Sequence, residues 1–263
     1  MGILNVTPDS FSDGGQFSAT ERAVTQARDM VTQGADIIDV GGESTRPGAE
    51  AVSVDEELSR VIPVLDRLAA DPDFSTPISI DTSKPEVMRA AVEAGATLVN
   101  DVRALQAPGA VDVCQALQVP VCLMHMQGAP RTMQANPAYD DVVQEVGDFL
   151  RARAAVCEAG GIARENILLD PGFGFGKSLT HNLCLLKHLD RLADLGYPLL
   201  VGLSRKSMFQ QLLDVPVSER LVASVAAAVL AVSRGARIVR VHDVLETVQA
   251  MQVYAAVEHA NCP

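Results

Sequence analysis

Eight short apolar runs recur along this sequence of 263 residues, and each is followed by a stretch with helical periodicity. The runs are apolar almost throughout, which is typical of parallel strands in a sheet covered on both faces. Eight strand–helix units in roughly 250 residues indicate a (β/α)8 barrel, and an open doubly wound sheet is the main alternative. We therefore predict an α/β fold, a single (β/α)8 TIM barrel in one domain over residues 1–263, with long loops after strands 1 and 2. The predicted strands are residues 2–6, 35–41, 77–82, 97–102, 119–125, 167–171, 198–204 and 237–242.

Glycines mark the ends of most of the predicted helices. The residue just past a helix often adopts a left-handed conformation, which glycine tolerates best. We expect this conformation at Gly34, Gly95, Gly160, Gly196 and Gly235. The predicted helices are residues 20–34, 54–70, 84–95, 108–117, 139–160, 181–196, 218–235 and 243–259.

Charge and apolar content exclude several classes of protein. A net charge of −12 argues against general nucleic-acid binding, which needs a basic surface. The longest near-apolar run, residues 222–232, is far shorter than the roughly 18 residues of a membrane span, and no signal peptide is recognisable. The five cysteines show no CxxC spacing, so we expect them to be reduced and mostly buried. These features predict a cytoplasmic protein that binds neither membranes nor nucleic acids.

Polar residues stand at the end of every predicted strand. One such residue would more often cap a strand, but the recurrence on eight strands is hard to attribute to capping alone. Since barrel enzymes carry their chemistry at the carboxyl ends of their strands, this pattern predicts a functional site there. The residues are Asn5, Asp39, Asp81, Asn100 with Asp101, His125, Asp170, the run Ser204-Arg205-Lys206, and the pair Arg240 and His242.

Two loops are long for connections between a strand and a helix, residues 7–15 and 41–48. Both contain Gly, Pro and small polar residues, and Phe11 lies near the tip of the first. They could be flexible surface loops or a lid that closes over a substrate, with Phe11 as its apolar contact. Position along the chain leaves both readings open.

The glycine-rich run 172–178 has the look of a phosphate-binding loop but fits neither standard motif. A Walker A motif would need glycine where Pro171 stands, and a dinucleotide fingerprint would need glycine at Lys177. We expect its glycines instead to let the backbone turn tightly beneath a flat ligand, beside Phe173 or Phe175.

Taken together, eight motifs in order resemble those of the dihydropteroate synthase family, and they cover nearly the whole chain. The resemblance implies a transferase of folate biosynthesis and a sulfonamide target. It implies that 4-aminobenzoate is joined to 6-hydroxymethyl-7,8-dihydropterin diphosphate, that diphosphate is released, and that Mg²⁺ is used. The motifs are residues 1–15, 39–48, 80–85, 99–102, 123–128, 170–177, 202–207 and 240–244.

The resemblance also implies roles for particular residues. The catalytic positions match Asp81, Asp170, Lys206, Arg240 and His242. The pterin positions match Asp81, Asn100, Met124, Asp170 and Lys206, and the diphosphate positions match Asn5, Arg240 and His242, with Asn5 also at the metal. The 4-aminobenzoate positions match Phe11, Thr45, Arg46, Pro47, Phe175 and Ser204.

The chemistry of these side chains agrees with the implied roles. A carboxylate such as Asp170 can accept two N–H groups from one edge of a pterin, and Asn100 offers both a donor and an acceptor. Cations such as Arg240 stabilise the charge that grows on a diphosphate leaving group. We hypothesise a largely dissociative substitution: the C–O bond breaks first, Asp81 and Asp170 stabilise the pterin cation, and the neutral arylamine then attacks without a general base.

Three further expectations follow. Residues 218–235 are apolar on nearly every helical face, which favours either a homodimer interface, as the resemblance implies, or burial by neighbouring helices. Family members usually carry a short segment ahead of the first strand, whereas Met1 already stands in it here; we expect this to affect stability before activity. Two alternatives stay open, a catalytically silent pterin-binding paralogue and a methyltetrahydrofolate–corrinoid methyltransferase.

Overall fold

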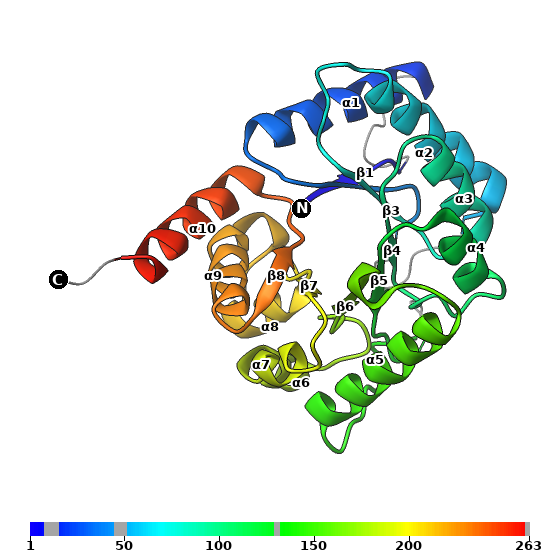
Figure 1. Cartoon of the computed structure of the whole chain (residues 1–263). Helices are drawn as coiled ribbons and strands as arrows, with labels where there is room; N and C mark the ends of the chain where they lie inside the picture. The colour runs from blue at the N-terminus through cyan, green and yellow to red at the C-terminus, as the bar shows by residue number, and fades with distance from the viewer. Residues whose placement is uncertain (8–15, 45–51, 129–131, 261–263) are drawn as a thin grey trace.

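A computed structural model describes residues 1–7, 16–44, 52–128 and 132–260. In these ranges eight parallel strands form one sheet in sequence order, and a helix or helices follow each strand, which confirms the predicted (β/α)8 architecture (Figure 1). The observed strands are shorter than predicted. Asn5, Asp81, Asp101 and Asp170 are the last residues of their strands, whereas Ser204, Arg240 and His242 lie beyond the ends of theirs. They are β1 Gly2–Asn5, β2 Ile38–Gly41, β3 Ile78–Asp81, β4 Leu98–Asp101, β5 Val121–Met124, β6 Ile167–Asp170, β7 Leu199–Val201 and β8 Ala236–Val239.

Backbone hydrogen bonds between the first strand and the end of the last one close the sheet into a ring. Gly2 forms a parallel bridge with Val241. The N–H of Ile3 donates to the Val241 carbonyl, and the N–H of Val241 donates to the Met1 carbonyl, each at 2.9 Å. Within the described ranges the join between β6 and β7 is sparse, since Leu169 and Leu199 form its one register pair.

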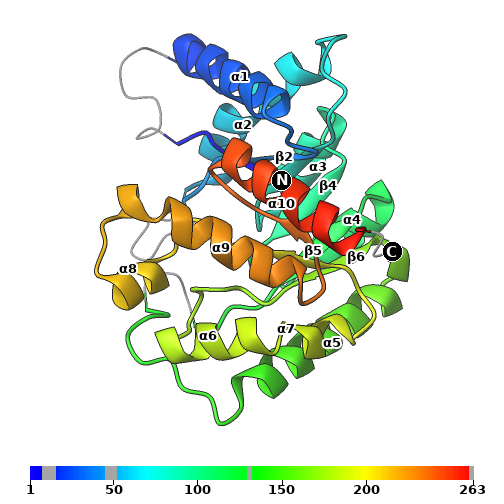
Figure 2. The same ribbon diagram turned by 90° about the vertical axis from the view of Figure 1, so that its left-hand side faces the viewer.

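The helices form the outer wall of the ring (Figures 1 and 2). The predicted helix 181–196 is wrong as a single element, since it breaks at His188. A helix after β7, α8, was not predicted; it ends at Asp214, which has a left-handed conformation (φ 54°), and Pro216 follows. The helices are α1 Gln16–Thr32, α2 Val54–Ala69, α3 Pro85–Glu93, α4 Ala110–Leu117, α5 Val142–Ala159, α6 Leu179–Lys187, α7 Leu189–Ala193, α8 Ser207–Leu213, α9 Leu221–Val232 and α10 Val244–Glu258, with 3-10 turns at Arg164–Asn166 and Val217–Glu219.

The predicted left-handed glycines are confirmed at four positions and wrong at the fifth. Gly34, Gly95, Gly196 and Gly235 have φ between 79° and 112°. After α5 the left-handed residue is Gly161 (φ 90°), whereas the predicted residue, Gly160, has a φ of −78°. Gly160 instead allows close packing, since a Cβ there would lie 2.4 Å from Val111 Cγ1.

An apolar floor inside the ring positions the site. Leu98, Cys122, Leu168 and Leu200 form a buried cluster with Met1, against which Ile37 and Ile238 pack. Side chains two residues apart on a strand point to the same face, so the next inward layer is partly polar. That layer includes Asn100, Met124, Asp170 and Arg240.

Other sequence expectations concern thiols and membranes. Cys114, Cys122 and Cys157 are free and buried, and Cys184 is free and half-buried. Among the described residues, no helix is both long enough and apolar enough to cross a membrane.

Candidate active site

A charged cluster lies on the inner face of the barrel, above the apolar floor. Arg240, at the end of β8, donates from Nε to Asp39 Oδ2 at 2.5 Å and from Nη2 to Asp81 Oδ2 at 2.7 Å. Asn100 Nδ2 donates to the same oxygen of Asp39 at 3.2 Å. The ring thus brings together side chains from β2, β3, β4 and β8 that are up to 201 residues apart in sequence.

Burial and the neighbouring charges shift the titration of this cluster. Burial raises the pKa of Asp81 to about 7; the Arg240 guanidinium opposes this shift, and the carboxylate of Asp39 adds to it. Burial works against the charge of Arg240, but Asp39 and Asp81 together raise its pKa. The guanidinium therefore stays charged between two carboxylates that are almost fully buried.

Asp39 is a member of this cluster to which the sequence assigned no role. It is fully buried, and its Oδ1 has no hydrogen-bond partner in the described structure. The sequence predicted it at the end of a strand, which is wrong, because it is the second residue of β2. Its pairing with Arg240 could not be read from local sequence. A single oxygen of Asp39, Oδ2, accepts hydrogen bonds from both Arg240 and Asn100 and so holds these two side chains close together.

A second group of predicted residues lies across the ring, around β6 and the turn after β7. Asp170 is buried, and its Oδ1 accepts a hydrogen bond from Gly172 N at 2.7 Å. Burial raises the pKa of Asp170, whereas the Gly172 N–H and the nearby Lys206 lower it. Burial lowers the pKa of Lys206 to about 8, opposed by the charge of Asp170.

Apolar side chains line this second group. The ammonium of Lys206 lies 4.3 Å from the centroid of the Phe175 ring, a cation–π contact. Phe175 also belongs to a buried cluster with Met124 and Met133. The predicted neighbours Asp170, Lys206, Met124 and Phe175 therefore share one wall, whereas Phe173 belongs to the main core.

Two more predicted residues meet at the ends of β7 and β8. Ser204 Oγ accepts a hydrogen bond from His242 N at 3.1 Å and lies 3.0 Å from His242 Nδ1. This contact holds the imidazole against the segment that follows β7. At the end of β1, Asn5 is half-buried, and no hydrogen bond of its side chain to another described residue is found.

Four predicted residues lie outside the described ranges, namely Phe11, Thr45, Arg46 and Pro47. The described residues on both sides of the second loop are firmly held. Glu43 Oε1 accepts from Val52 N at 3.2 Å, and its Oε2 accepts from Lys84 Nζ at 2.5 Å. Lys84 also donates to the fully buried Glu57 of α2 at 2.5 Å.

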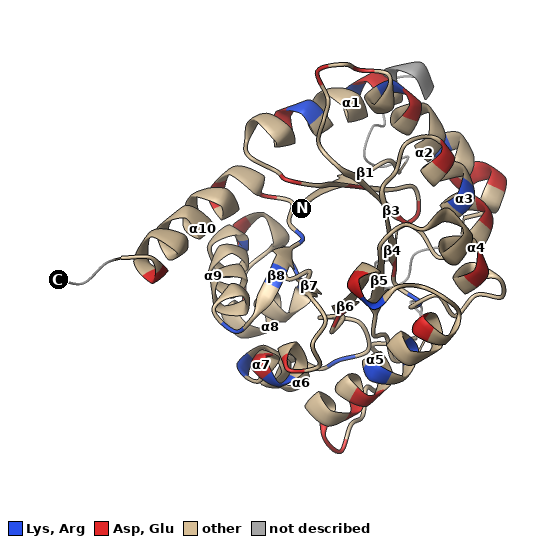
Figure 3. Ribbon diagram, in the orientation of Figure 1, with Lys and Arg blue, Asp and Glu red and all other residues tan. Residues whose placement is uncertain are grey.

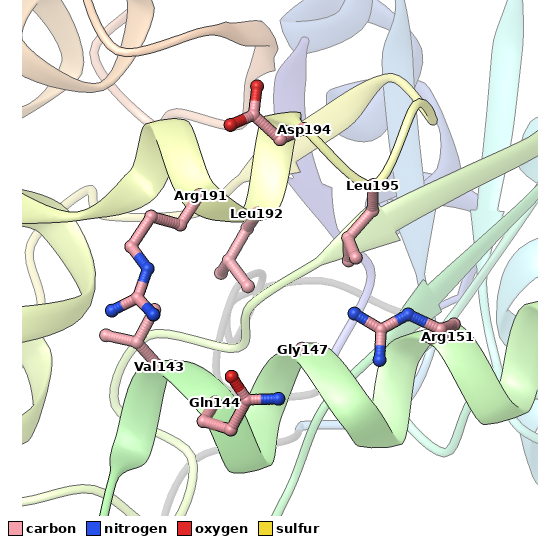
Figure 4. Close-up of a pocket in the computed structure, with 8 residues that line it drawn as sticks. All are labelled: Val143, Gln144, Gly147, Arg151, Arg191, Leu192, Asp194 and Leu195. Carbon is pink, nitrogen blue, oxygen red and sulfur yellow. The ribbon is translucent and has the colours of Figure 1, made fainter.

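The outer wall contains a crevice that is unrelated to these residues. It has a volume of about 230 Å³ between α5 and α7, and Arg151 and Arg191 are on its rim (Figure 4). No predicted site residue lines it. Acidic and basic residues are interspersed over the outer helices, so the outer surface offers no single cationic face (Figure 3).

The inner face can therefore perform a particular kind of chemistry. It offers buried carboxylates to N–H groups, an ammonium beside an aromatic ring, and a guanidinium held by two carboxylates. Such a site suits a flat heterocycle that carries an anionic group, since each end of the ligand meets the opposite charge.

Comparison with known proteins decides the family. A family model described as "Pterin binding enzyme" matches residues 1–242. The dihydropteroate synthase of Escherichia coli (strain K12) is 57% identical over 256 residues, which are 97% of this chain and 90% of the relative. The chain belongs to the dihydropteroate synthase family.

Solved structures of family members agree. The Yersinia pestis dihydropteroate synthase with a sulfonamide drug has a TM-score of 0.93 at 53% identity, covering 99% of this chain and 94% of that one. The Xanthomonas albilineans dihydropteroate synthase with 4-aminobenzoic acid has the same TM-score and identity, covering 99% and 93%.

The resemblance predicted from the motifs is thus confirmed. As a dihydropteroate synthase, the protein is a transferase of folate biosynthesis. The methyltransferase alternative finds no support in these relatives, which are all dihydropteroate synthases.

Proposed function

We propose that the protein joins 4-aminobenzoate to 6-hydroxymethyl-7,8-dihydropterin diphosphate at the carboxyl edge of one barrel domain spanning residues 1–263. The observation that carries this proposal is the convergence of Asp170, Lys206 and Arg240 around one inner face. Each of these three groups influences the titration of another, although they come from three different strand–helix units. The free thiols of Cys114 and Cys122 fit a reducing compartment, so we expect the enzyme to act in the cytoplasm.

The pterin ring would lie against the wall formed by β4, β5 and β6. Asp170 has one oxygen bonded to Gly172 N and can accept from the N–H groups along one edge of the ring. Asn100 is held by Asp39 through its amide N–H, which leaves its carbonyl oxygen to accept from the ligand. Met124 would supply an apolar surface, Lys206 would donate to a ring oxygen or nitrogen, and Asp81 would lie near the carbon that reacts.

The diphosphate would lie towards β1 and β8. Arg240 and His242 are two residues apart on β8 and the segment that follows it, and both would donate to phosphate oxygens. Asn5 would offer an amide oxygen to Mg²⁺. This donor set fits the metal, because Mg²⁺ commonly takes one or two protein oxygens and completes its shell with phosphate oxygens and water. No group of three or more His, Cys, Asp or Glu residues in the described ranges could hold a metal, so binding would depend on the substrate.

The 4-aminobenzoate would bind beside Phe175 and Ser204. Phe175 borders the pterin wall through its contact with Lys206, and Ser204 borders the proposed diphosphate site through its contact with His242. The resemblance adds Phe11, Thr45, Arg46 and Pro47 from the two long loops. That the Xanthomonas albilineans relative holds 4-aminobenzoic acid supports this assignment.

We infer a largely dissociative substitution. The C–O bond to the diphosphate breaks first, and the electron pair leaves with the leaving group. The carboxylates of Asp81 and Asp170 stabilise the positive charge that spreads over the dihydropterin ring, while Arg240 and His242 stabilise the charge on the leaving group. Bound Mg²⁺ would supply further positive charge to the diphosphate. The neutral arylamine then forms the C–N bond and loses its extra proton to water.

Diphosphate release tests this function directly. We expect release to require both 4-aminobenzoate and Mg²⁺, and we expect a sulfonamide to compete with 4-aminobenzoate. Removing Mg²⁺ with a chelator should lower the rate by at least tenfold and should leave the melting temperature of the free enzyme almost unchanged. A protein that binds the pterin substrate but releases no diphosphate would be the silent paralogue.

We also infer that the enzyme is a homodimer that uses α9 and α10. These helices lie side by side on the outer wall (Figures 1 and 2). Both expose large apolar side chains, including Val222 (79% exposed) on α9 and Val253 (66%) and Val257 (67%) on α10. Contiguous exposed apolar surface commonly marks an interface.

Light scattering should give twice the monomer mass at micromolar concentration. The double variant Val253→Asp/Val257→Asp should be monomeric, because two charges would have to be buried at the interface. A wild-type protein that remains monomeric at that concentration would refute the dimer.

A further inference from the structure

Lys177 is a buried cation to which the sequence assigned no role. Its side chain is 3% exposed. In the described structure its ammonium forms no ion pair with a carboxylate; it donates to Gly172 O at 2.9 Å and to Phe175 O at 3.0 Å, and it lies 2.9 Å from His125 Nδ1. An ammonium has three N–H donors, so these three acceptors use all of them. The His125 carbonyl lies slightly farther away, at 3.4 Å.

Side chains also satisfy the rest of the glycine-rich turn, which has little regular structure of its own. Tyr139 Oη donates to Gly176 O at 2.9 Å, and Gln134 Nε2 donates to Gly174 O. Asn182 Oδ1 accepts from Gly174 N at 2.8 Å. The turn is therefore specified by two donors and one acceptor from outside it, with the Lys177 ammonium at its centre.

The turn is pressed against the segment that follows β5. Its three glycines have φ between 66° and 80°. A Cβ at Gly172 would lie 1.9 Å from His125 O, and a Cβ at Gly176 would lie 2.3 Å from Gln127 O. Since both obstacles are backbone atoms, only glycine fits at these two positions. The confirmed tight turn thus leaves Lys177 enclosed between two chain segments.

Both carbonyls that Lys177 binds belong to residues that touch the proposed pterin site. Gly172 donates its N–H to Asp170 Oδ1, and Phe175 places its ring against the Lys206 ammonium. A Cβ on Gly174, between them, would lie 3.3 Å from Lys206 Cδ. Displacement of the turn would therefore change both the carboxylate and the ammonium that face the pterin.

We propose that Lys177 is a positioning residue whose ammonium acts as an internal cation, holding the 172–176 turn so that Asp170 and Lys206 are aligned for the pterin substrate. The inference rests on the proposed roles of Asp170 and Lys206. Lys177 itself touches neither the substrate nor the reacting atoms.

The charges of these groups act on one another, and burial works against the charge of Lys177. The charge of Lys177 helps to lower the pKa of Asp170, together with Gly172 N–H and Lys206. Burial lowers the pKa of Lys177 to about 7, and Asp170 opposes that shift. Burial and the adjacent Lys177 also lower the pKa of His125 to about 3, so its ring stays neutral and Nδ1 can accept the ammonium N–H.

The test measures the Kd of the pterin diphosphate substrate by calorimetry, with Mg²⁺ and without 4-aminobenzoate, alongside the melting temperature. Lys177→Met keeps most of the side-chain volume and removes the charge. It should weaken binding about tenfold, the equivalent of one lost charge-assisted hydrogen bond. Lys187→Met, at an exposed position at the end of α6, is the matched control and should bind as the wild type does.

Chemical rescue separates the charge from mere filling of space. Lys177→Ala leaves a cavity that propylammonium can fill with the missing methylenes and the missing charge. Propylammonium should restore most of the affinity, and 1-propanol, which has a similar shape and no charge, should not. Equal rescue by the alcohol, or unchanged affinity in Lys177→Met, would overturn the inference.

Two further results keep the outcome decisive. If neither Lys177 variant folds, Tyr139→Phe removes one hydrogen bond to the same turn and should weaken binding about threefold; unchanged affinity there would also overturn the inference.

Asp170→Asn serves as the reference for the proposed function. If it binds the pterin substrate normally, the proposed function fails; if it binds poorly while Lys177→Met binds normally, only the role of Lys177 fails.

Discussion

Asp170→Asn should reduce turnover by about 100-fold or more, with the fold intact, because it removes charge from the point where the pterin cation forms. The amide has almost the same shape as the carboxylate and can still accept the hydrogen bond from Gly172 N. It offers one acceptor oxygen instead of two, however, and its N–H group would face the N–H edge of the pterin. Steady-state kinetics with both substrates, together with circular dichroism, measures this effect.

The matched control for that variant is Asp190→Asn, which makes the same chemical change on the exposed surface of α7. It should leave both kcat and KM unchanged. Turnover by Asp170→Asn close to that of the control would remove Asp170 from the mechanism.

Arg240→Met should have the largest effect on stability. Arg240 is the one ion-pair partner recorded for Asp39 and for Asp81 in the described structure, and both carboxylates are almost fully buried. Removing one partner of a buried ion pair leaves an uncompensated charge and lowers the free energy of unfolding by roughly 3–5 kcal/mol. Diphosphate release should fall as well, because the proposed leaving-group cation is lost. Urea unfolding at pH 7 measures the first effect.

The loss of stability in Arg240→Met should depend on pH, in a direction that the pKa of Asp81 sets. The pKa of Asp81 is raised in the folded protein from 3.8 to about 7, so the folded state binds more protons than the unfolded state between these values. This contribution to stability is complete below pH 3.8 and falls as the pH rises towards 7. Without Arg240 the pKa of Asp81 should rise further, so the variant should lose stability more steeply above pH 7 than the wild type does.

Arg28→Met provides the comparison for Arg240→Met. Arg28 is 54% exposed and pairs with Asp71, so its loss should change the free energy of unfolding by no more than about 1 kcal/mol. An Arg240 variant as stable as this control would show that Arg240 does not stabilise the two buried carboxyl groups.

The barrel and the strand-end residues were predictable because both leave local signals. A strand buried on both faces is an uninterrupted apolar run, and the first polar residue after it marks the carboxyl edge, as Asp81 and Asp170 do. Because the eight strand ends lie on one edge of a closed ring, the polar side chains at these ends converge.

What the sequence could not provide were contacts between distant segments. Nothing near Asp39 indicates that it binds a guanidinium 201 residues away. Lys177 was noted only as the mismatch with a dinucleotide-binding fingerprint, although a lysine directly after three alternating glycines could have suggested an ammonium that binds the carbonyls of a tight turn. The short helix α8 was missed because seven residues carry too little periodicity. The left-handed residue was misplaced by one position at Gly160 because two glycines adjoin there.

The sparse join between β6 and β7 has a consequence for how the enzyme responds to its substrates. One register pair links these strands, and they carry Asp170 and lead into the Lys206 turn. A bound pterin would contact residues on both sides of this join and would therefore link the two strands. Occupancy should therefore slow amide hydrogen exchange at Leu169 and Leu199 more than at the densely bonded β1–β2 boundary.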